Sequence, residues 1–499
     1  MIPLRRPVFG SITTLALVAT PAQAEEVLHV VPVDPLMILP FGILLLAIAV
    51  MPFINRHWWE RNYPYVSVAL AVVTIAYYIF GIENVPRLLH TAYEYISFIA
   101  LIGSLFVVAG GIHIRIRGKS TPLRNVFLLA IGAVISNIVG TTGASMILIR
   151  PYIRVNRYRI KPFHIVFFIF IVSNMGGALT PIGDPPLFLG YLKGIPFFWV
   201  AEHLWYKWAL GMALILLIFF VIDLWSFRRL PLVIEHRAEI EHEEGEVSGA
   251  HNVFYLVIIL IAIFITDPPF VREALMALAA FASYKTTRHE THKKNDFNFI
   301  PIKEVAILFF GIFATMVPAL DWLELNASRI GIQSPSHFYW ATGVLSAVLD
   351  NAPTYLNFLT AAIGLFVDET MVKQVMHLVQ THGEDLGVLI GAHAVEIKNT
   401  YLTLMKYHSD LVASGAVLVD NIQVSYLIGN HNIYIQAVSI AAVFFGAMTY
   451  IGNGPNFMVK SIAEQSGVPC PSFFGYIAKF SIPILLPIFA LVWWLFFRI

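Results

Sequence analysis

The chain has 499 residues, of which 58% are hydrophobic and only 13% are charged, and its mean hydropathy is +0.73. Because soluble domains carry about a quarter charged residues, this composition excludes a soluble enzyme and a disordered chain. The 32 basic and 31 acidic residues nearly balance, which indicates no nucleic-acid partner. The single cysteine, Cys470, excludes a disulfide framework and a cysteine-based metal site.

The first residues have the pattern of an export signal. Arg5 and Arg6 precede an apolar stretch, which ends in Ala22-Gln23-Ala24. A basic start, a short apolar region and a small-x-small ending are typical of a secretory signal peptide, so we expect residues 1–24 to be removed. The alternative is an uncleaved first membrane anchor. Either route leads to a membrane, and we expect the bacterial cytoplasmic membrane.

Two sets of apolar stretches follow, each set containing five candidates for membrane spans of about 20 residues. The first set, within 25–227, lies near 36–54, 63–81, 93–113, 163–192 and 207–226, and the second, within 252–499, lies near 252–267, 272–287, 303–320, 432–460 and 472–497. The charged stretch 228–251 separates the sets and predicts a solvated cytoplasmic linker. Lys and Arg concentrate in the connections that would be cytoplasmic if both mature termini lie outside.

Two further apolar stretches, 125–149 and 338–366, contain Gly, Ser and Asn in their middles. The first has basic clusters at both ends, which predicts a hairpin that enters from the cytoplasm and returns; the second should enter from outside. We therefore expect an all-α polytopic membrane protein, built as an inverted repeat with five transmembrane helices and one re-entrant hairpin in each half.

The internal repeat is also visible in short motifs. The fourth span of each half is interrupted, by Thr180-Pro181-Ile182-Gly183-Asp184-Pro185-Pro186 and by Thr449-Tyr450-Ile451-Gly452-Asn453-Gly454-Pro455. The hairpins contain Ser136-Asn137 followed by Gly140, and Asp350-Asn351 followed by Pro353. The second half is longer by an insertion within 367–431. It is amphipathic and mixed in charge, so we expect interfacial helices on the extracytoplasmic side.

Broken helices at the membrane midplane free backbone carbonyls that suit a cation. Asp184 and Asp350 would add negative charge there, and a carboxylate in hydrocarbon is expected to be protonated, paired or cation-bound. We predict both as proton- and cation-coupling residues. The predicted metal ligands are Asp184, Asp350, Asn137 and Asn351, and the other predicted ion-binding residues are Ser136, Asn174, Thr180, Thr354, Thr449 and Asn453. Such hard oxygen ligands favour Na⁺ or Li⁺, and no cofactor is expected.

Simpler interpretations exist for the same residues. Asp184 precedes Pro185, and an Asp before a proline at the first helical position is a good helix N-cap. Asp350 before Asn351 and Pro353 allows the same interpretation. The hydroxyl groups could simply donate to carbonyl groups of their own helices.

The segment Ser173–Gly190 closely resembles the NhaD-type sodium/proton antiporters, which belong to the ion transporter superfamily with the arsenite, citrate and dicarboxylate carriers. Leu349–Tyr355 resembles the same group, and the likeness covers residues 35–498. The resemblance implies a scaffold domain and a transport domain with two hairpins, usually dimeric and moving as an elevator. The dicarboxylate relatives carry Ser-Asn-Thr at both hairpin tips. Here the tips read Ser136-Asn137-Ile138 and Leu349-Asp350-Asn351, which favours a cation exchanger.

The first hypothesis is therefore Na⁺(Li⁺)/H⁺ antiport, in which a midplane carboxylate holds either the cation or protons. The second is Na⁺-coupled symport of a di- or tricarboxylate. A third, an intramembrane hydrolase that uses Ser and Asp, lacks any recognisable motif, so we expect no enzyme. The expected partners are the lipid bilayer, small inorganic cations and a second copy of the chain.

Overall fold

The computed structural model describes residues 31–115, 120–229, 246–265, 268–387 and 393–498. The expected signal peptide at 1–24 and most of the expected 228–251 linker lie outside these ranges. The described chain is helical except for one small sheet, in which β1 (His113–Arg115) pairs antiparallel with β2 (Glu246–Ser248). The predicted all-α class is correct apart from this sheet.

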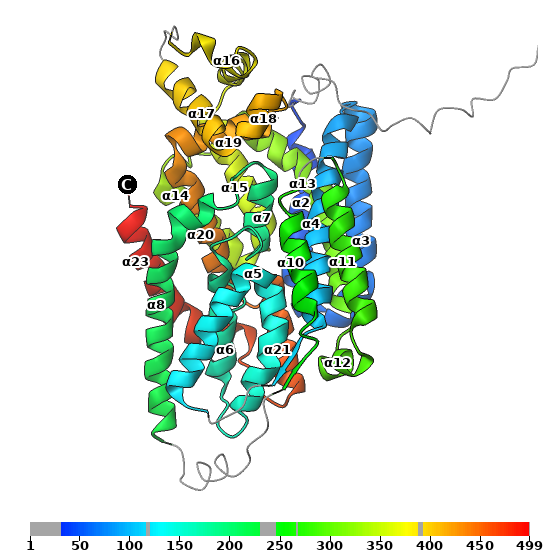
Figure 1. Cartoon of the computed structure of the whole chain (residues 1–499), viewed down its shortest axis with the longest axis vertical. Helices are drawn as coiled ribbons and strands as arrows, with labels where there is room; N and C mark the ends of the chain where they lie inside the picture. The colour runs from blue at the N-terminus through cyan, green and yellow to red at the C-terminus, as the bar shows by residue number, and fades with distance from the viewer. Residues whose placement is uncertain (1–30, 116–119, 230–245, 266–267, 388–392, 499) are drawn as a thin grey trace, which may run out of the picture.

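Six helices form one group, the six-helix bundle, on the right of Figure 1. They are α2 (Leu39–Ile54), α3 (Arg56–Ala76), α4 (Val85–Gly110), α10 (Asn252–Ala262), α11 (Val271–Thr286) and α13 (Ile300–Asn326). Short elements extend them: η1 (Pro35–Ile38), η2 (Tyr77–Gly81), α12 (His289–Lys294) and η4 (Ala327–Arg329). With 11 residues, α10 is shorter than the stretch 252–267 expected there, whereas α11 has 16 residues and matches the expected 272–287 to within one position.

The other membrane helices form a second group, the hairpin bundle, on the left of Figure 1. From the first half it contains α5 (Pro122–Val155), α6 (Pro162–Ile171), η3 (Met175–Gly177), α7 (Pro185–Leu192) and α8 (Trp199–Phe227). From the second half it contains α14 (Pro335–Val348), α15 (Asn351–Phe366), α20 (Asn432–Phe445), η6 (Gly446–Met448), α21 (Gly454–Gln465), α22 (Phe473–Tyr476), η7 (Ile477–Leu485) and α23 (Leu486–Phe496).

Helix α5 folds back on itself at Gly140. The side chains of Asn125 and Asn156 are joined by a hydrogen bond of 2.8 Å, although a straight helix would hold them about 46 Å apart. At Gly140 the backbone has φ 78° and ψ 155°, a region that essentially only glycine adopts. The chain therefore reverses inside the stretch 125–149, and we call α5 hairpin 1.

Helices α14 and α15 form the second reversal, hairpin 2, at Leu349 and Asp350. The rings of Phe338 and Phe358 lie 6.2 Å apart although 20 positions separate them in the chain. The stretch 338–366 that the sequence predicts as a hairpin therefore also folds back, beginning slightly earlier at Pro335.

Two helices of the hairpin bundle are interrupted where the sequence predicts a break. In the first half, α6 ends at Ile171 and α7 begins at Pro185, while in the second half α20 ends at Phe445 and α21 begins at Gly454. Proline stands at the first or second position of both α7 and α21, where its missing N–H costs nothing. Each half thus has the same order of elements: three helices, a hairpin, a broken helix and a last helix.

The protein is a multi-span membrane protein. Seven helices of the described chain are long and apolar enough to cross a bilayer, or up to nine if each of two sharply bent pairs counts as one span. The seven include α5, which the Asn125–Asn156 contact shows to be a hairpin. Helix length alone therefore does not give five full spans in each half, because α6 and α7 of the first half and α10 and α11 of the second half are short.

The insertion 367–431 folds into α16 (Glu369–Gln380), η5 (Glu384–Gly387), α17 (Ala394–Tyr407), α18 (Ser409–Ser414) and α19 (Val419–Asn430). These helices enclose a small apolar core that includes Val375, Leu378 and Leu404. They lie at the end of the molecule opposite to α12 (Figure 1). This position agrees with interfacial helices on one side of the membrane, and which side it is stays a prediction.

Candidate functional site

Asp184 is buried at the centre of the hairpin bundle and accepts three side-chain hydrogen bonds. Its Oδ1 accepts from Thr141 Oγ1 at 2.7 Å and from Asn453 Nδ2 at 2.8 Å. Its Oδ2 accepts from Asn351 Nδ2 at 2.6 Å. The carboxylate is 1% exposed. Hairpin 1, hairpin 2 and both broken helices therefore converge on one acidic side chain.

The side chain of Asp184 does not cap its own helix. Asp184 is the N-cap residue of α7, but Pro185 and Pro186 follow it and neither has an N–H to donate, and its side chain makes no capping bond. The capping interpretation is therefore wrong for Asp184. It is correct for Asp350, whose Oδ1 accepts from the N–H of Ala352 at 3.1 Å.

Two buried amide oxygens at the helix breaks and the tip of hairpin 2 have no hydrogen-bond donor. Oδ1 of Asn174 and Oδ1 of Asn351 are both buried and accept nothing from the described residues. The amide group of Asn174 instead donates to Ile169 O at 2.8 Å and to Asn456 Oδ1 at 2.6 Å. Buried polar atoms without a partner are costly, so this pair of oxygens requires an explanation.

The two amides lie against the same glycine. A methyl group placed on Gly446 would lie 3.1 Å from Asn174 Oδ1 and 3.3 Å from Asn351 Nδ2. Asn351 in turn bonds to Asp184. One carboxylate and two unpaired amide oxygens thus lie in one buried region, and this donor set fits a hard monovalent cation.

Other predicted ligands have structural hydrogen bonds. Asn137 Nδ2 donates to Gly176 O at 2.6 Å, and its Oδ1 accepts from the N–H of Leu179 at 2.9 Å. Thr180 Oγ1 donates to Asn137 O at 2.6 Å. These bonds fix the tip of hairpin 1 to the first helix break. They do not bring Asn137 or Thr180 to Asp184, and a metal role for Asn137 stays a prediction.

The second half repeats this pattern. Thr449 Oγ1 donates to Ala347 O at 2.7 Å in hairpin 2, as Thr180 does to Asn137 O. Each threonine hydroxyl also accepts from the N–H three positions later, at 3.1 Å from Gly183 and at 3.0 Å from Gly452. Thr354 donates to Asp350 O at 2.9 Å within its own helix, as the alternative interpretation predicted.

The hydrogen bonds of the two hairpins show which residues of one hairpin correspond to which of the other. This correspondence differs from the one in the sequence analysis, which matched Ser136-Asn137 with Asp350-Asn351. Ser136 Oγ donates across the bundle to Val172 O at 2.7 Å, and Ser346 Oγ donates in the same way to Ala442 O at 2.6 Å. Ser136 therefore corresponds to Ser346, not to Asp350. In this register Thr141 corresponds to Asn351, and both donate to Asp184.

Sequence reasoning missed Thr141 because the motif Ser136-Asn137 drew attention to the residues before the reversal. The signal that could have found it is Gly140, the point at which hairpin 1 reverses, since Asp350 stands at the corresponding point of hairpin 2. The residue after each reversal point then becomes the candidate.

A small cavity of about 30 Å³ adjoins the site. It lies between α4, represented by Leu105, and the tip of hairpin 1, represented by Gly140, Thr141 and Thr142. Phe188 of α7 closes another side. This volume holds about one water molecule, so the space is closed to a larger solute in this conformation.

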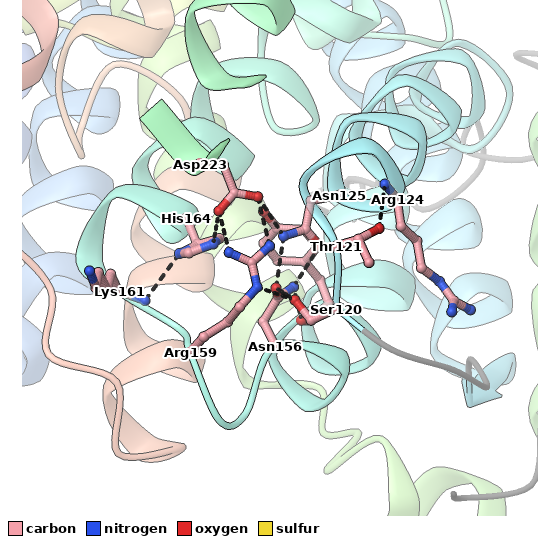
Figure 2. Close-up of polar contacts among 10 residues, drawn as sticks. Ser120, Thr121, Arg124, Asn125, Asn156, Arg159, Lys161, His164 and Asp223 are labelled. Carbon is pink, nitrogen blue, oxygen red and sulfur yellow. Dashed lines mark hydrogen bonds and ion pairs between the residues drawn. The ribbon is translucent and has the colours of Figure 1, made fainter. Parts of the chain in front are cut away.

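A second polar cluster fixes the open end of hairpin 1 (Figure 2). Asp223 of α8 forms an ion pair with Arg159 and accepts hydrogen bonds from His164 Nε2 at 3.1 Å and Asn125 Nδ2 at 3.0 Å. His164 Nδ1 accepts from the N–H of Lys161 at 3.0 Å, which leaves Nε2 as the donor. This cluster joins both ends of hairpin 1 to α6 and α8 and lies apart from Asp184.

Buried cations of the hairpin bundle have partners away from Asp184. Lys207 of α8 is 1% exposed and donates through Nζ to Gln436 Oε1 at 2.6 Å. Among the described residues no Lys or Arg forms an ion pair with Asp184. Within the part of the chain that the structure describes, the carboxyl group of Asp184 therefore contacts neutral hydrogen-bond donors and no counter-charge.

Comparison with known proteins gives a family for the chain. Residues 31–497 match the family described as "Putative citrate transport". Curated proteins give no match to the chain.

Proposed function

We propose a transport reaction from the premise that the chain belongs to this citrate-transport family and is a membrane transporter, not an enzyme. In this proposal the protein carries citrate or a related di- or tricarboxylate together with Na⁺. The observation that carries this proposal is the buried cluster around Asp184. The family match supports the ion transporter superfamily that the sequence predicts, but it gives the citrate-transport family and not the sodium/proton antiporters.

Asp184 is the proposed main ligand of the coupling cation. An ionised carboxylate in the membrane interior costs at least about 3 kcal/mol, and a bound cation removes much of that cost. The unpaired oxygens of Asn174 and Asn351 support the assignment because they offer neutral ligands beside the carboxylate. Binding of Na⁺ would neutralise the charge of Asp184 and satisfy both amide oxygens at once.

The proposed place for the anionic substrate is the space between α4 and the tip of hairpin 1. The second arm of hairpin 1 begins after Gly140, and the backbone N–H groups at a helix N-terminus attract carboxylates. This position lies next to Thr141, which donates to Asp184. Substrate and cation would then bind as neighbours and reduce each other's charge.

Transport requires that the site open alternately to the two sides. The repeated order of elements and the matched bonds of Thr180 and Thr449 support the predicted inverted repeat. We propose that the six-helix bundle is the scaffold and that the hairpin bundle moves as an elevator. A homodimer, both mature termini outside and an extracytoplasmic insertion remain predictions.

Na⁺(Li⁺)/H⁺ antiport is the second candidate. It is favoured by one observation, namely that Asp184 has no Lys or Arg partner among the described residues and can hold either a cation or a proton. A buried carboxylate that exchanges these two ions couples their flows by competition. In this case no organic anion would be needed.

The test uses the purified full-length chain in vesicles. Under the first proposal, an inward Na⁺ gradient drives uptake of labelled citrate, and replacing Na⁺ with choline abolishes it. The same vesicles, loaded with acid and a pH-sensitive dye, show no Na⁺-dependent loss of the pH gradient without citrate. Na⁺-dependent proton movement without any citrate uptake would contradict the first proposal and support antiport.

A further inference from the structure

A large apolar cavity lies between the two bundles, apart from Asp184. Its volume is about 360 Å³, within the range of small-molecule binding pockets. One wall comes from α2 and α13 of the six-helix bundle, and the other comes from both arms of hairpin 2. The loop between α13 and α14 closes one end through Ala327, Ile330 and Ile332.

The lining offers little to a polar ligand. Its two polar residues are Thr354 and Asn357, and both side chains donate to carbonyl groups of their own helix, at 2.9 Å to Asp350 O and at 2.7 Å to Pro353 O. The remaining lining residues are apolar. Cavities of this kind exclude water and take up apolar ligands.

The cavity is continuous with the surface that faces the bilayer. Leu345 lines the cavity and is also 44% exposed, and its neighbours Val344 and Val348 on α14 are exposed as well. On the opposite wall, α2 exposes Leu46. In a membrane protein these side chains face lipid tails, so an acyl chain can enter the cavity without leaving hydrocarbon.

A cation stands at the loop end of the same cavity. Arg329 is exposed and lies between two lining residues, Ala327 and Ile330. It forms no ion pair with the described residues. Trp322 lines the same end, and Trp side chains prefer the level of the lipid headgroups.

We propose that this cavity binds one acyl chain of an anionic phospholipid whose phosphate pairs with Arg329. The bound chain would contact both bundles, and its far end would reach Leu349, the neighbour of Asp350 at the tip of hairpin 2. The lipid would thus stabilise the present arrangement of the two bundles. This inference does not depend on which solute is transported.

The first experiment maps the lipid directly. The purified full-length protein is placed in phosphatidylethanolamine vesicles that contain phosphatidylglycerol with a photoactivatable diazirine in its acyl chain. After illumination, peptide mass spectrometry should find labels on the lining segments 319–332 and 345–361. Labels distributed over the exposed faces of α3 and α8 without enrichment in these two segments would overturn the proposal.

The second experiment separates the acyl chain from the headgroup. Ala361→Phe fills the cavity and should reduce labelling of 319–332 at least twofold, whereas the matched Ala213→Phe on the exposed face of α8 should not. Arg329→Gln should lower the preference for phosphatidylglycerol over a zwitterionic diazirine lipid about fivefold, as expected for one cation near a lipid headgroup.

The charge control is Lys398→Gln, an exposed cation on α17 that does not line the cavity. Equal preference in the wild type and in Arg329→Gln would refute an anionic headgroup at this position. If Ala361→Phe does not fold, the label positions and the Arg329→Gln comparison still decide the question.

Discussion

Asn351 donates a hydrogen bond of 2.6 Å to Oδ2 of Asp184, although 167 positions separate the two residues in the chain. The tip of hairpin 2 is thereby joined to the first broken helix. Asn453, on the second broken helix, donates to Oδ1 of the same carboxylate at 2.8 Å. Neither half of the chain can form this cluster alone, because Asp184 belongs to the first half and two of its three hydrogen-bond donors belong to the second.

The two acidic residues at the helix breaks should differ when neutralised. Asp184→Asn should reduce citrate uptake about 10- to 100-fold at low Na⁺, because a charged interaction of about 1.5–3 kcal/mol with the cation is lost. Asp350→Asn should change uptake at most about twofold, because Asn is as good a helix N-cap as Asp. Both are measured as initial uptake rates in vesicles over a range of Na⁺ concentrations.

An equal loss of citrate uptake in the two variants would contradict this difference and indicate that Asp350 also binds the coupling ion, as the sequence analysis predicted. Surface expression and gel filtration of each variant show whether a loss reflects misfolding.

Removal of the cation should destabilise the protein. A ligand present at 100 times its dissociation constant stabilises the folded state by about 2.7 kcal/mol. Replacing Na⁺ with choline should therefore lower the melting temperature of the detergent-purified wild type. Asp184→Asn should melt at the same temperature in both salts. A salt effect of equal size in wild type and variant would show that Na⁺ acts elsewhere.

The hairpins should expose their ends on opposite sides of the membrane. Single cysteines at Arg124 and Arg157 should react with an impermeant maleimide from the cytoplasmic side, and those at Gln333 and Glu369 from the outer side. The background is Cys470→Ser. This change removes the single native cysteine, so every label reports an introduced one. Labelling of Arg124→Cys and Arg157→Cys from different sides would exclude a re-entrant hairpin 1.

The cluster in Figure 2 should be essential for stability. Asp223→Asn leaves the buried guanidinium of Arg159 without its counter-charge, and breaking a buried pair costs about 3–5 kcal/mol. We expect a clear drop in melting temperature. Lys161→Gln, an exposed change in the same region, should stay within about 0.5 kcal/mol. An unchanged melting temperature for Asp223→Asn would show that this pair is dispensable.

Acidic pH should lower the stability of the insertion 367–431. His408 Nε2 lies 3.0 Å from Gly194 O, and burial lowers the pKa of His408 below its usual 6.5. The unfolded segment then binds more protons than the folded one, so stability is complete above about pH 6.5 and falls as the pH drops through that value. Proteolysis of the insertion should be faster at about pH 5.5 than at about pH 8. His408→Asn, which cannot titrate, should reduce this difference, and an unaltered difference would exclude His408.

Local features of the sequence were enough to predict much of the fold. Hydropathy identified a multi-span membrane protein, and basic residues at both ends of 125–149 indicated a chain reversal. Proline helped to locate both helix breaks, because a missing N–H acts on the residue itself, and Gly140 adopts the positive φ at which hairpin 1 reverses. The same reasoning overestimated the length of α10, since apolar composition does not fix where a helix ends.

Asp184 and Asp350 could not be told apart from the sequence, because each precedes a proline within three positions and can cap a helix. Only the tertiary structure decided that Asp350 caps α15 while Asp184 accepts bonds from Thr141, Asn351 and Asn453. Chain composition and local backbone preference act over a few residues and determine elements. Partners from 43 to 269 positions away meet only when the packed helices place them side by side, and that packing assembles the candidate site.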